Sequence, residues 1–300
     1  MNIAAFLELP LITDYPLSKA DYFQSYKELS IEVTKLGAHF YIVRHQSTYR
    51  GSGVFEKSWQ YDGDRLKETG EVKIDIVYDK GEFVSDSQVK VLNCTYINDL
   101  CTNKWQMFEK YQQYCPQTWY IDSNEELHEK LPSVATSIAV IKPIDGEEGT
   151  DVYIDTPQNL KSKMYNFPLL LQEFIDTSSG VPGIVDGLHD FRIAILNGEI
   201  IYSYYRTPPQ GSYLANVAKG GSFALVDPEK IPSQAKQLVL SIDKELEAYG
   251  QRFYGIDVGF TPSGPKIIEM NSRLGLLPNS DGEAFVVLKQ KLAKTLVSMV

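Results

Sequence analysis

Three oxygen-bearing side chains come close together near the end of the 300-residue sequence: Asp257, Glu269 and Asn271. They lie in the segments GIDVGF and PKIIEMN, which flank the turn-forming run TPSGP and predict a β-hairpin centred on Ser263. In that pairing Asp257 faces Glu269, and strand alternation places Asn271 on the same face. The same register pairs Phe260 with Lys266 and Val258 with Ile268, and it directs four side chains to the packed face: Ile256, Val258, Ile268 and Met270.

Two carboxylates directly opposite each other on paired strands lie roughly 4.5–5.5 Å apart at Cβ, and their repulsion favours a positive charge between them. A divalent cation meets this need, and a set of oxygen-only ligands suits Mg²⁺ or Mn²⁺ better than zinc. Mg²⁺ also keeps positions for phosphate oxygens, so this face predicts nucleotide chemistry. The alternative is that Asp257 and Glu269 lie on a solvated face and pair with lysines.

A second motif, VIKPIDGEEGTDV, places Lys142 at the end of a predicted strand and follows it with a turn that contains Gly146 and Gly149. Backbone N–H groups in such a turn can hold phosphate oxygens, and the lysine adds a positive charge. A plain hairpin turn is the alternative, and the acidic residues Glu147 and Glu148 weigh against anion binding.

The overall composition is that of an ordinary globular protein with a net charge of −10. This charge argues against partners such as nucleic acids and anionic membranes. No apolar run approaches the length of about 20 residues that spans a bilayer, and the N-terminus lacks the basic region of a signal peptide. Three cysteines without metal-site spacing fit a reducing compartment, so we expect a cytoplasmic protein.

The remaining patterns predict strands in antiparallel pairs, which indicates an α+β fold and argues against a Rossmann sheet. Asn197-Gly198 predicts the turn of a hairpin over 189–206, and Ser123 with Glu126 predicts a capped helix start. Strands are expected at 39–44, 72–78, 89–93, 137–143 and 167–176. Helices are expected at 19–36, 103–114, 123–131, 232–250 and 282–299.

Taken in order, these motifs resemble the carboxylate–amine ligase branch of the ATP-grasp superfamily, which includes glutathione synthetase, the ribosomal-protein glutamate ligases and D-alanine–D-alanine ligase. The resemblance covers roughly residues 96–300. It implies an ATP-grasp fold, in which two subdomains (96–175 and 176–300) grip ATP between antiparallel sheets, preceded by a small α/β domain (1–95). It also implies ATP and Mg²⁺ or Mn²⁺ as cofactors.

The resemblance assigns nucleotide contacts residue by residue. Lys104 in CTNKWQMF and Lys142 are similar in position to the phosphate-binding lysines, with Gly146 and Gly149 as glycines of the flexible loop. The segment LLLQEFID matches the hinge strand that reads adenine, and Asp176 at its end is a candidate ribose contact. The hinge residues are then Gln172, Glu173, Phe174 and Ile175.

Further matches concern the phosphoryl group and the substrate. Arg192 in DFRIAILNGE matches a family arginine, and YYRTPPQGSYLANVAKGGS supplies phosphate and acyl-phosphate contacts. The second segment contributes Arg206, Asn216, Lys219, Gly220 and Gly221. Arg273, just after the expected metal ligands, is placed to grip a substrate carboxylate. The sequence departs from the pattern in its short acidic loop and in Tyr205, where many members carry a second arginine.

The resemblance implies an ADP-forming ligase that joins a carboxylic acid to an amine through an acyl phosphate, with small-molecule acid and amine substrates such as amino acids or short peptides. A homodimer is also compatible with it. Two alternatives stay open: a small-molecule kinase on the same scaffold, similar to the inositol phosphate kinases, and a non-catalytic ATP-binding regulator.

Overall fold

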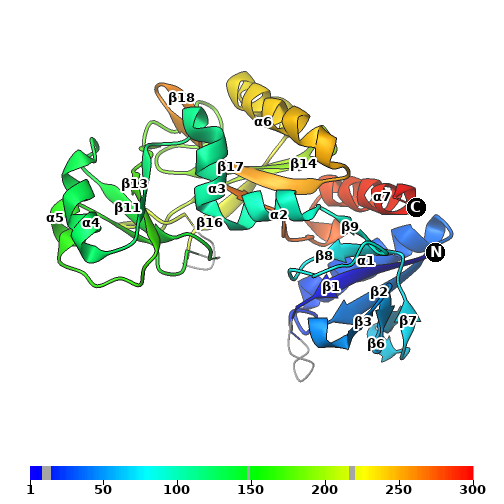
Figure 1. Cartoon of the computed structure of the whole chain (residues 1–300). Helices are drawn as coiled ribbons and strands as arrows, with labels where there is room; N and C mark the ends of the chain where they lie inside the picture. Colours follow the sequence, from blue (N-terminus) through cyan, green and yellow to red (C-terminus); the bar gives the residue numbers. More distant parts are fainter. Residues whose placement is uncertain (9–14, 147–148, 216–219, 300) are drawn as a thin grey trace.

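The computed structural model describes residues 1–8, 15–146, 149–215 and 220–299, and it arranges their strands in four sheets (Figure 1). Within these ranges no helix combines the length and the apolar character needed to cross a membrane. Helices accompany both parallel and antiparallel strand pairs, as expected for an α+β protein.

The N-terminal region is built on a six-stranded sheet in the order β6-β5-β2-β1-β8-β9. Strands β2, β1, β8 and β9 run parallel, with β9 at one edge, and the β5–β6 hairpin pairs antiparallel to β2 at the other edge. The bounds are β1 (Asn2–Leu7), β2 (His39–Arg44), β5 (Trp59–Asp62), β6 (Arg65–Glu68), β8 (Ile76–Asp79) and β9 (Lys90–Leu92). Helix α1 (Ala20–Lys35) connects β1 to β2, and a small sheet of β3 (Tyr49–Gly51), β4 (Val54–Phe55) and β7 (Val72–Lys73) packs nearby.

One strand of this region was not predicted, and one expectation was wrong. The sequence pattern did not predict β1, whose residues from Ile3 to Leu7 are all buried, because a strand covered on both faces shows no alternation. The expected single strand over 72–78 is divided between two sheets. The division falls at Ile74, whose N–H donates to Gly53, and at Asp75, whose carboxylate accepts from the backbone of Asn2.

The middle of the chain forms an antiparallel sheet in the order β10-β13-β11-β12. Its strands are β10 (Thr118–Ile121), β11 (Ala139–Pro143), β12 (Tyr153–Asp155) and β13 (Leu169–Glu173), packed against α4 (Asn124–Lys130) and α5 (Pro157–Lys161). The predicted helix start is confirmed, since the Ser123 hydroxyl accepts from the Glu126 N–H at 3.2 Å. Helices α2 (Thr95–Thr102) and α3 (Lys104–Tyr111) precede this sheet.

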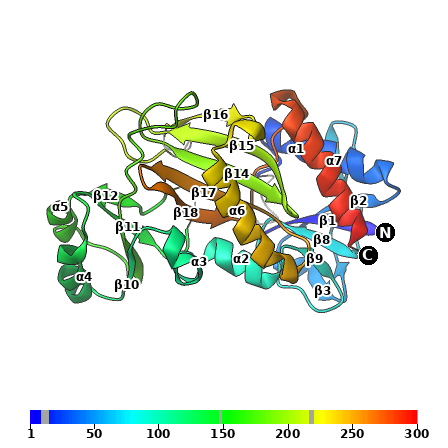
Figure 2. The ribbon, with the colours of Figure 1, turned by 90° about the horizontal axis from the view of Figure 1, so that it is seen from above.

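The last part of the chain forms a five-stranded antiparallel sheet in the order β16-β15-β14-β17-β18. Figure 2 shows α6 (Ser233–Leu246) lying across this sheet, while α7 (Glu283–Ser298) runs beside α1. The strands are β14 (Asp190–Leu196), β15 (Glu199–Thr207), β16 (Ser222–Val226), β17 (Phe253–Thr261) and β18 (Gly264–Asn271). The Asn197-Gly198 turn is confirmed, with φ of 49° and 88° at its two residues.

The β17–β18 hairpin keeps the predicted pairing of Asp257 with Glu269 but reaches it by a different register. The tip pairs Thr261 with Gly264, and Val258 therefore faces Ile267 instead of Ile268. A β-bulge between Asp257 and Val258 then absorbs one residue and restores the expected pairing at the base. As a result Ile267 is buried in the core, and Ile268 lines a cavity rather than packing as predicted.

A buried ion pair fastens α6 to the beginning of β17, the strand that carries Asp257. Asp243 of α6 accepts from Arg252 Nε at 2.7 Å and from Nη2 at 2.5 Å, and the Tyr254 hydroxyl donates to the same carboxylate. The side chains of Asp243 and Arg252 are only 2% and 6% exposed. Removing one partner would leave the other charge buried without compensation.

We therefore expect Asp243→Ala to lower the free energy of unfolding by about 3–5 kcal/mol, as measured by urea denaturation. The matched control is Glu247→Ala, which removes an exposed acid paired with Lys244 and should leave the unfolding curve unchanged. A loss in the Asp243 variant no larger than in the control would contradict this role.

Candidate active site

A cavity of about 410 Å³ opens where the two antiparallel sheets meet, and most of the residues predicted to do chemistry line it. Five lysine and arginine side chains and four acidic side chains line it in a chain of net charge −10, so the lining is more positive than the chain as a whole. A volume in this range suits a small-molecule ligand. The predicted residues found in the lining are Lys104, Lys142, Gly146, Gly149, Gln172, Glu173, Phe174, Ile175, Arg192, Arg206, Asp257, Glu269, Asn271 and Arg273.

Five predicted residues are not among them. Asp176, the candidate ribose contact, is exposed, and its carboxylate accepts from the backbone N–H of Ser178 in a local turn. Gly220 and Gly221 are also absent from the lining, and a side chain at Gly221 would collide with the carbonyl of Ala215 at 2.6 Å. The positions of Asn216 and Lys219 fall outside the residues that the structure describes.

A fully buried carboxylate, Asp257, holds two of the arginines of the cavity together. Arg192 binds it through two bonds of 2.6 Å, and Arg206 Nη2 contacts it at 2.6 Å. Arg206 Nε in turn donates to Asp190 at 2.7 Å. Both guanidinium groups lie near the ring of Tyr204, with distances of 5.9 and 6.0 Å to its centroid. The four charged side chains thus form one network on three adjacent strands.

This network changes the interpretation of the paired carboxylates. Arg192 Nη2 lies 2.6 Å from Asp257 and 3.6 Å from Glu269, so a guanidinium already supplies the positive charge that their repulsion requires. Burial alone would raise the pKa of Asp257, but the charges of Arg192 and Arg206 hold that pKa below its ordinary value. Like-charge repulsion at this pair is therefore no argument for a metal ion by itself.

The donor set is nevertheless compatible with Mg²⁺. Glu269 has a side chain 29% exposed, and Asn271 beside it donates to the Glu269 carboxylate at 3.2 Å. Both line the cavity, together with Asp257, and all three offer oxygen atoms. In the described residues no group of three or more His, Cys, Asp and Glu side chains is placed to hold a metal, so the amide oxygen of Asn271 is needed as the third donor.

The two lysines approach the cavity from the opposite wall. Lys142 of β11 is buried and donates to the Gln172 side chain at 2.9 Å, and Gln172 is fixed in turn by donating to Thr118 at 2.7 Å. Burial lowers the pKa of Lys142 to about 8, while the nearby charge of Glu269 opposes the shift. Lys104, at the start of α3, donates to the carbonyl of Gly146 at 2.8 Å and so contacts the glycine-containing loop.

The segment after β13 is held close to β17 by a glycine. A Cβ atom at Gly259 would lie 2.8 Å from the Ile175 side chain and 2.9 Å from that of Thr177, so a larger residue would push this segment away. Phe174 packs edge to face with Tyr213, at 5.2 Å between ring centroids. The predicted hinge therefore runs along the cavity between the two sheets.

Sequence reasoning missed two residues of the cavity, Asp190 and Tyr22, and it also missed Tyr204, which lies beside the arginine network. Asp190 shares a strand face with Arg192, so the i, i+2 rule could have identified it. Tyr204 lies directly opposite Arg192 on the neighbouring strand, but only the strand pairing reveals this. Tyr22, on α1 of the N-terminal region, also lines the cavity, and no local pattern near it indicates such a role.

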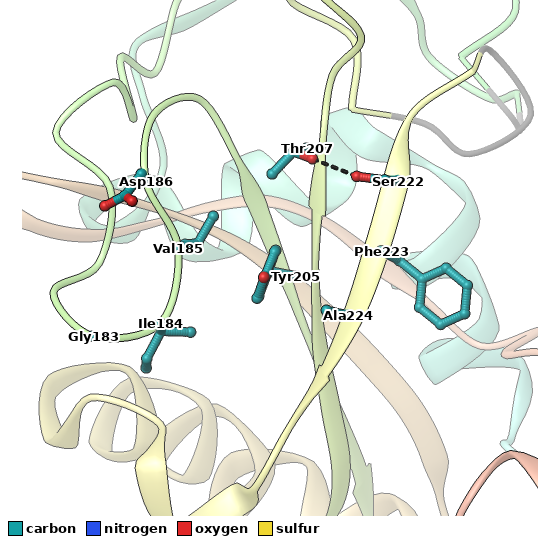
Figure 3. Close-up of a pocket in the computed structure, with 9 residues that line it drawn as sticks. All are labelled: Gly183, Ile184, Val185, Asp186, Tyr205, Thr207, Ser222, Phe223 and Ala224. Atoms are coloured by element: carbon teal, nitrogen blue, oxygen red, sulfur yellow. Dashed lines mark hydrogen bonds between the residues drawn. The ribbon is translucent and has the colours of Figure 1, made fainter.

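A second hollow of about 360 Å³ lies on the opposite face of β15 and β16 (Figure 3). Tyr205 and Thr207 line it, whereas Arg206 between them lines the main cavity, as strand alternation requires. Figure 3 shows the loop around Asp186 facing these strands, and a hydrogen bond of 2.7 Å between Thr207 and Ser222. Tyr205, the position at which the resemblance implies a second arginine, therefore does not face the main cavity.

Comparison with known families decides what this arrangement is. The family model described as the RimK-like ATP-grasp domain matches residues 102–296, about two thirds of the chain. The chain belongs to the RimK-like ATP-grasp family. The expected ATP-grasp fold is thereby confirmed, and the matched range includes all of the predicted site residues.

Individual relatives of this RimK-like chain are distant. A probable alpha-L-glutamate ligase from Shewanella halifaxensis is 27% identical over 177 residues, which cover 57% of this chain and 36% of that protein. A protein of the same name from Psychromonas ingrahamii is 26% identical over 167 residues, covering 54% of this chain and 51% of its own length. The chain thus spans about a third to a half of the curated relatives that it matches.

Solved structures resemble the chain over nearly its whole length. A RimK domain ATP-grasp protein from Sphaerobacter thermophilus covers 99% of this chain and 100% of its own, with a TM-score of 0.62 and 12% identity. A D-alanyl-alanine synthetase A from Vibrio cholerae covers 99% and 98%, with a TM-score of 0.60 and 13% identity. At such low identities these similarities establish the fold alone.

The arginine network predicts a structural role for Asp257 that is separate from any metal. In the presence of a chelator, Asp257→Asn should lower the free energy of unfolding by about 3–5 kcal/mol, because Arg192 and Arg206 lose the anion between them. Glu269→Gln changes a partly exposed carboxylate on the residue that pairs with Asp257. It should lower the free energy of unfolding by less than about 1 kcal/mol in the same urea titration. Equal losses in the two variants would show that the network is not held by Asp257.

Proposed function

We propose that the RimK-like chain is an ATP-dependent carboxylate–amine ligase, which forms an amide or peptide bond and releases ADP and phosphate. The observation that supports it most is the single cavity that gathers two lysines, two arginines and the Asp257, Glu269 and Asn271 oxygens between two antiparallel sheets. Proteins named as ligases among its relatives and structural neighbours favour the same activity.

In this proposal the adenine of ATP lies along the hinge from Glu173 to Ile175, and the phosphates extend toward the network. Lys104 and Lys142 contact the phosphates, with Gly146 and Gly149 beside them in the same cavity. Arg206, fixed by Asp190 and Asp257, is already oriented before the transferred phosphoryl group arrives.

Glu269, Asn271 and Asp257 are the residues that would hold Mg²⁺. When bound there, the ion neutralises the charge of the β- and γ-phosphates. Arg192 keeps the Asp257 carboxylate ionised and correctly oriented, and Arg206 stabilises the negative charge of the phosphoryl group in transfer.

The reaction proceeds in two displacements. An oxygen of the substrate carboxylate attacks the γ-phosphorus, the bond to the β–γ bridging oxygen breaks, and ADP leaves with that electron pair. The amine nitrogen then attacks the acyl carbon, the bond between carbon and phosphate oxygen breaks, and phosphate leaves with that electron pair. The proton lost by the amine passes to the departing phosphate. The chain contributes positioning and charge stabilisation, with exclusion of water to protect the acyl phosphate from hydrolysis.

We also propose an organisation for this activity. The boundary between a substrate-binding domain (1–95) and the ATP-grasp module (96–300, divided near 175) falls near the end of β9 at Leu92 and the start of α2 at Thr95. The substrates are a small carboxylic acid and an amine, either of which is an amino acid or a short peptide. A homodimer and a cytoplasmic location complete this picture.

The first experiment measures ADP and phosphate release with Mg-ATP against a matrix of amino acids and short peptides. Release stimulated by one acid–amine pair is expected, and Glu269→Ala should reduce it at least about 100-fold. Glu245→Ala, which removes an exposed acid on α6, is the control and should keep full activity.

Other outcomes select the alternatives. Transfer of the phosphoryl group to an acceptor without release of free phosphate would identify a small-molecule kinase. Bound ATP with neither release nor transfer for any substrate would identify a regulatory binder. Either result would overturn the ligase proposal.

The pKa of about 8 at Lys142 predicts a pH dependence for nucleotide binding. Lys142 is charged below this pH and neutral above it, and a polyphosphate prefers the charged form. The affinity for a non-hydrolysable ATP analogue should therefore fall by up to about tenfold from pH 8 to pH 9, measured by calorimetry. The Lys142→Gln variant should bind more weakly, with a flat profile over this range.

The contribution of Lys142 to folding stability changes with pH in the opposite direction. Because the pKa of Lys142 is lower in the folded state, the unfolded chain binds more protons between about pH 8 and the ordinary lysine pKa, so this group increases folding stability as the pH rises. If the nucleotide affinity of Lys142→Gln fell as steeply between pH 8 and pH 9 as that of the unchanged protein, the pH dependence would belong to another group.

A further inference from the structure

The ring of Tyr204 lies against both arginines of the network that Asp257 holds. Tyr204 is on β15, directly opposite Arg192 on β14 and two residues before Arg206 on its own strand. These positions put the three side chains on one face of the sheet. The two guanidinium groups lie 5.9 and 6.0 Å from the ring centroid, which is within the range of a cation–π contact. One ring therefore contacts two cations at once.

The carboxylates of the network fix each guanidinium through its N–H groups. Arg192 binds Asp257 through Nε and Nη2, and Arg206 divides its bonds between Asp257 and Asp190. A phosphate that accepts from Arg206 competes for these same N–H groups, so the carboxylates hold the arginine least when such a ligand arrives. A contact with the face of a ring uses no N–H group and is kept throughout.

The Tyr204 ring is itself held by other aromatic rings. Tyr202 on the same strand lies nearly parallel to it, with an interplanar angle of 7° and centroids 6.2 Å apart. Tyr202 is buried and packs on Phe285 of α7 at 5.2 Å between centroids. Phe223 of β16 packs edge to face on Tyr204 at 5.8 Å. The four rings connect the core beneath α7 with the edge of the five-stranded sheet, and Tyr204 is the ring that meets the arginines.

This arrangement accounts for two exposed apolar side chains at the edge of the sheet. Phe223 is paired with Arg206 and Leu225 with Tyr204, and the two are 48% and 42% exposed. Paired residues share a face, so both side chains border the arginine side of the sheet on its outer strand. A cation–π contact is stronger where water is kept away. An apolar border at this edge therefore strengthens the contacts of Tyr204.

We propose that Tyr204 is a positioning residue for phosphoryl transfer, because its ring keeps the guanidinium groups of Arg192 and Arg206 aligned when a phosphoryl group takes hydrogen bonds from them. The inference rests on the proposed function. Tyr204 does not line the cavity, so it acts through the arginines that do. Phe223 supports it by holding the edge of its ring.

Nuclear magnetic resonance tests this alignment without any turnover. A proton over the face of an aromatic ring resonates upfield, so the side-chain signals of Arg192 and Arg206 should be displaced in the full chain labelled with ¹³C,¹⁵N-arginine. Replacing each of these arginines by lysine removes one signal and so assigns it. Tyr204→Leu should abolish both displacements, and Tyr204→Phe should keep them. The matched control is Tyr249→Leu, which removes a tyrosine that stacks on Tyr96 outside the cavity and should leave both signals in place.

Steady-state kinetics connect the alignment with the reaction. For an acid–amine pair that stimulates ADP release, Tyr204→Leu should lower kcat at least about tenfold and leave the KM for ATP within about twofold, because the aligned charges act mainly in the transition state. Tyr204→Phe should keep both values within about twofold of those of the unchanged protein, since phenylalanine presents the same kind of ring face. Tyr249→Leu should behave as the unchanged protein does.

A second variant tests the support of the ring at a position where folding is not at risk. Phe223→Leu keeps an apolar side chain at an exposed site but removes the edge-to-face partner of Tyr204. It should move both arginine signals part of the way toward their positions in Tyr204→Leu. It should also lower kcat about threefold.

The proposal is overturned if folded Tyr204→Leu keeps both arginine signals or its kcat, or if Tyr204→Phe is as impaired as Tyr204→Leu. If Tyr204→Leu does not fold, Phe223→Leu decides in its place, and unmoved arginine signals in that variant would refute the proposal. Failure of the proposed function is a separate result. In that case no acid–amine pair would release ADP, while the arginine signals would keep their dependence on Tyr204.

Discussion

The carboxylate of Asp257, fully buried between two guanidinium groups, is the interaction on which the rest of the site depends. A buried charge of this kind is tolerated only where its partners are held in good geometry. Strand pairing provides that geometry, because Arg192 lies directly opposite Asp257 on β14. Arg206 reaches the same carboxylate from β15 and is held at its other end by Asp190. The sheet thus orients two cations toward the cavity before any ligand is present.

The opposite wall uses weaker and more adaptable contacts. Lys142 is held by a glutamine side chain and Lys104 by a loop carbonyl, and among the described residues neither amine has a carboxylate as its hydrogen-bond partner. In the part of the chain that the structure describes, the arginines of β14 and β15 therefore donate to carboxylates, whereas the lysines of β11 and α3 donate to uncharged groups. This asymmetry suits an anion that enters between the walls, because its charge compensates the lysines without disturbing the arginine network.

Local sequence signals predicted much of this arrangement. The Asn197-Gly198 turn, the cap at Ser123 and the face shared by Glu269 and Asn271 all follow from rules that act over a few residues. Contacts between distant segments did not follow from such rules. Arg192 was expected at the site, but its bond to Asp257 depends on the pairing of β14 with β17, and the part played by Tyr22 depends on the packing of the N-terminal region. Strand β1 escaped prediction because burial on both faces removed its alternation.

The bulge between Asp257 and Val258 divides the hairpin into two independently registered parts. The base of the hairpin pairs with β14, where Arg192 lies opposite Asp257. Among the described strands, the part of β17 beyond Val258 pairs only with β18. Homologous chains can therefore differ by a residue at the tip and still place their carboxylates opposite each other. An alignment that counts residues outward from the turn would match the wrong side chains, so relatives of this chain are better aligned from Asn271 backward.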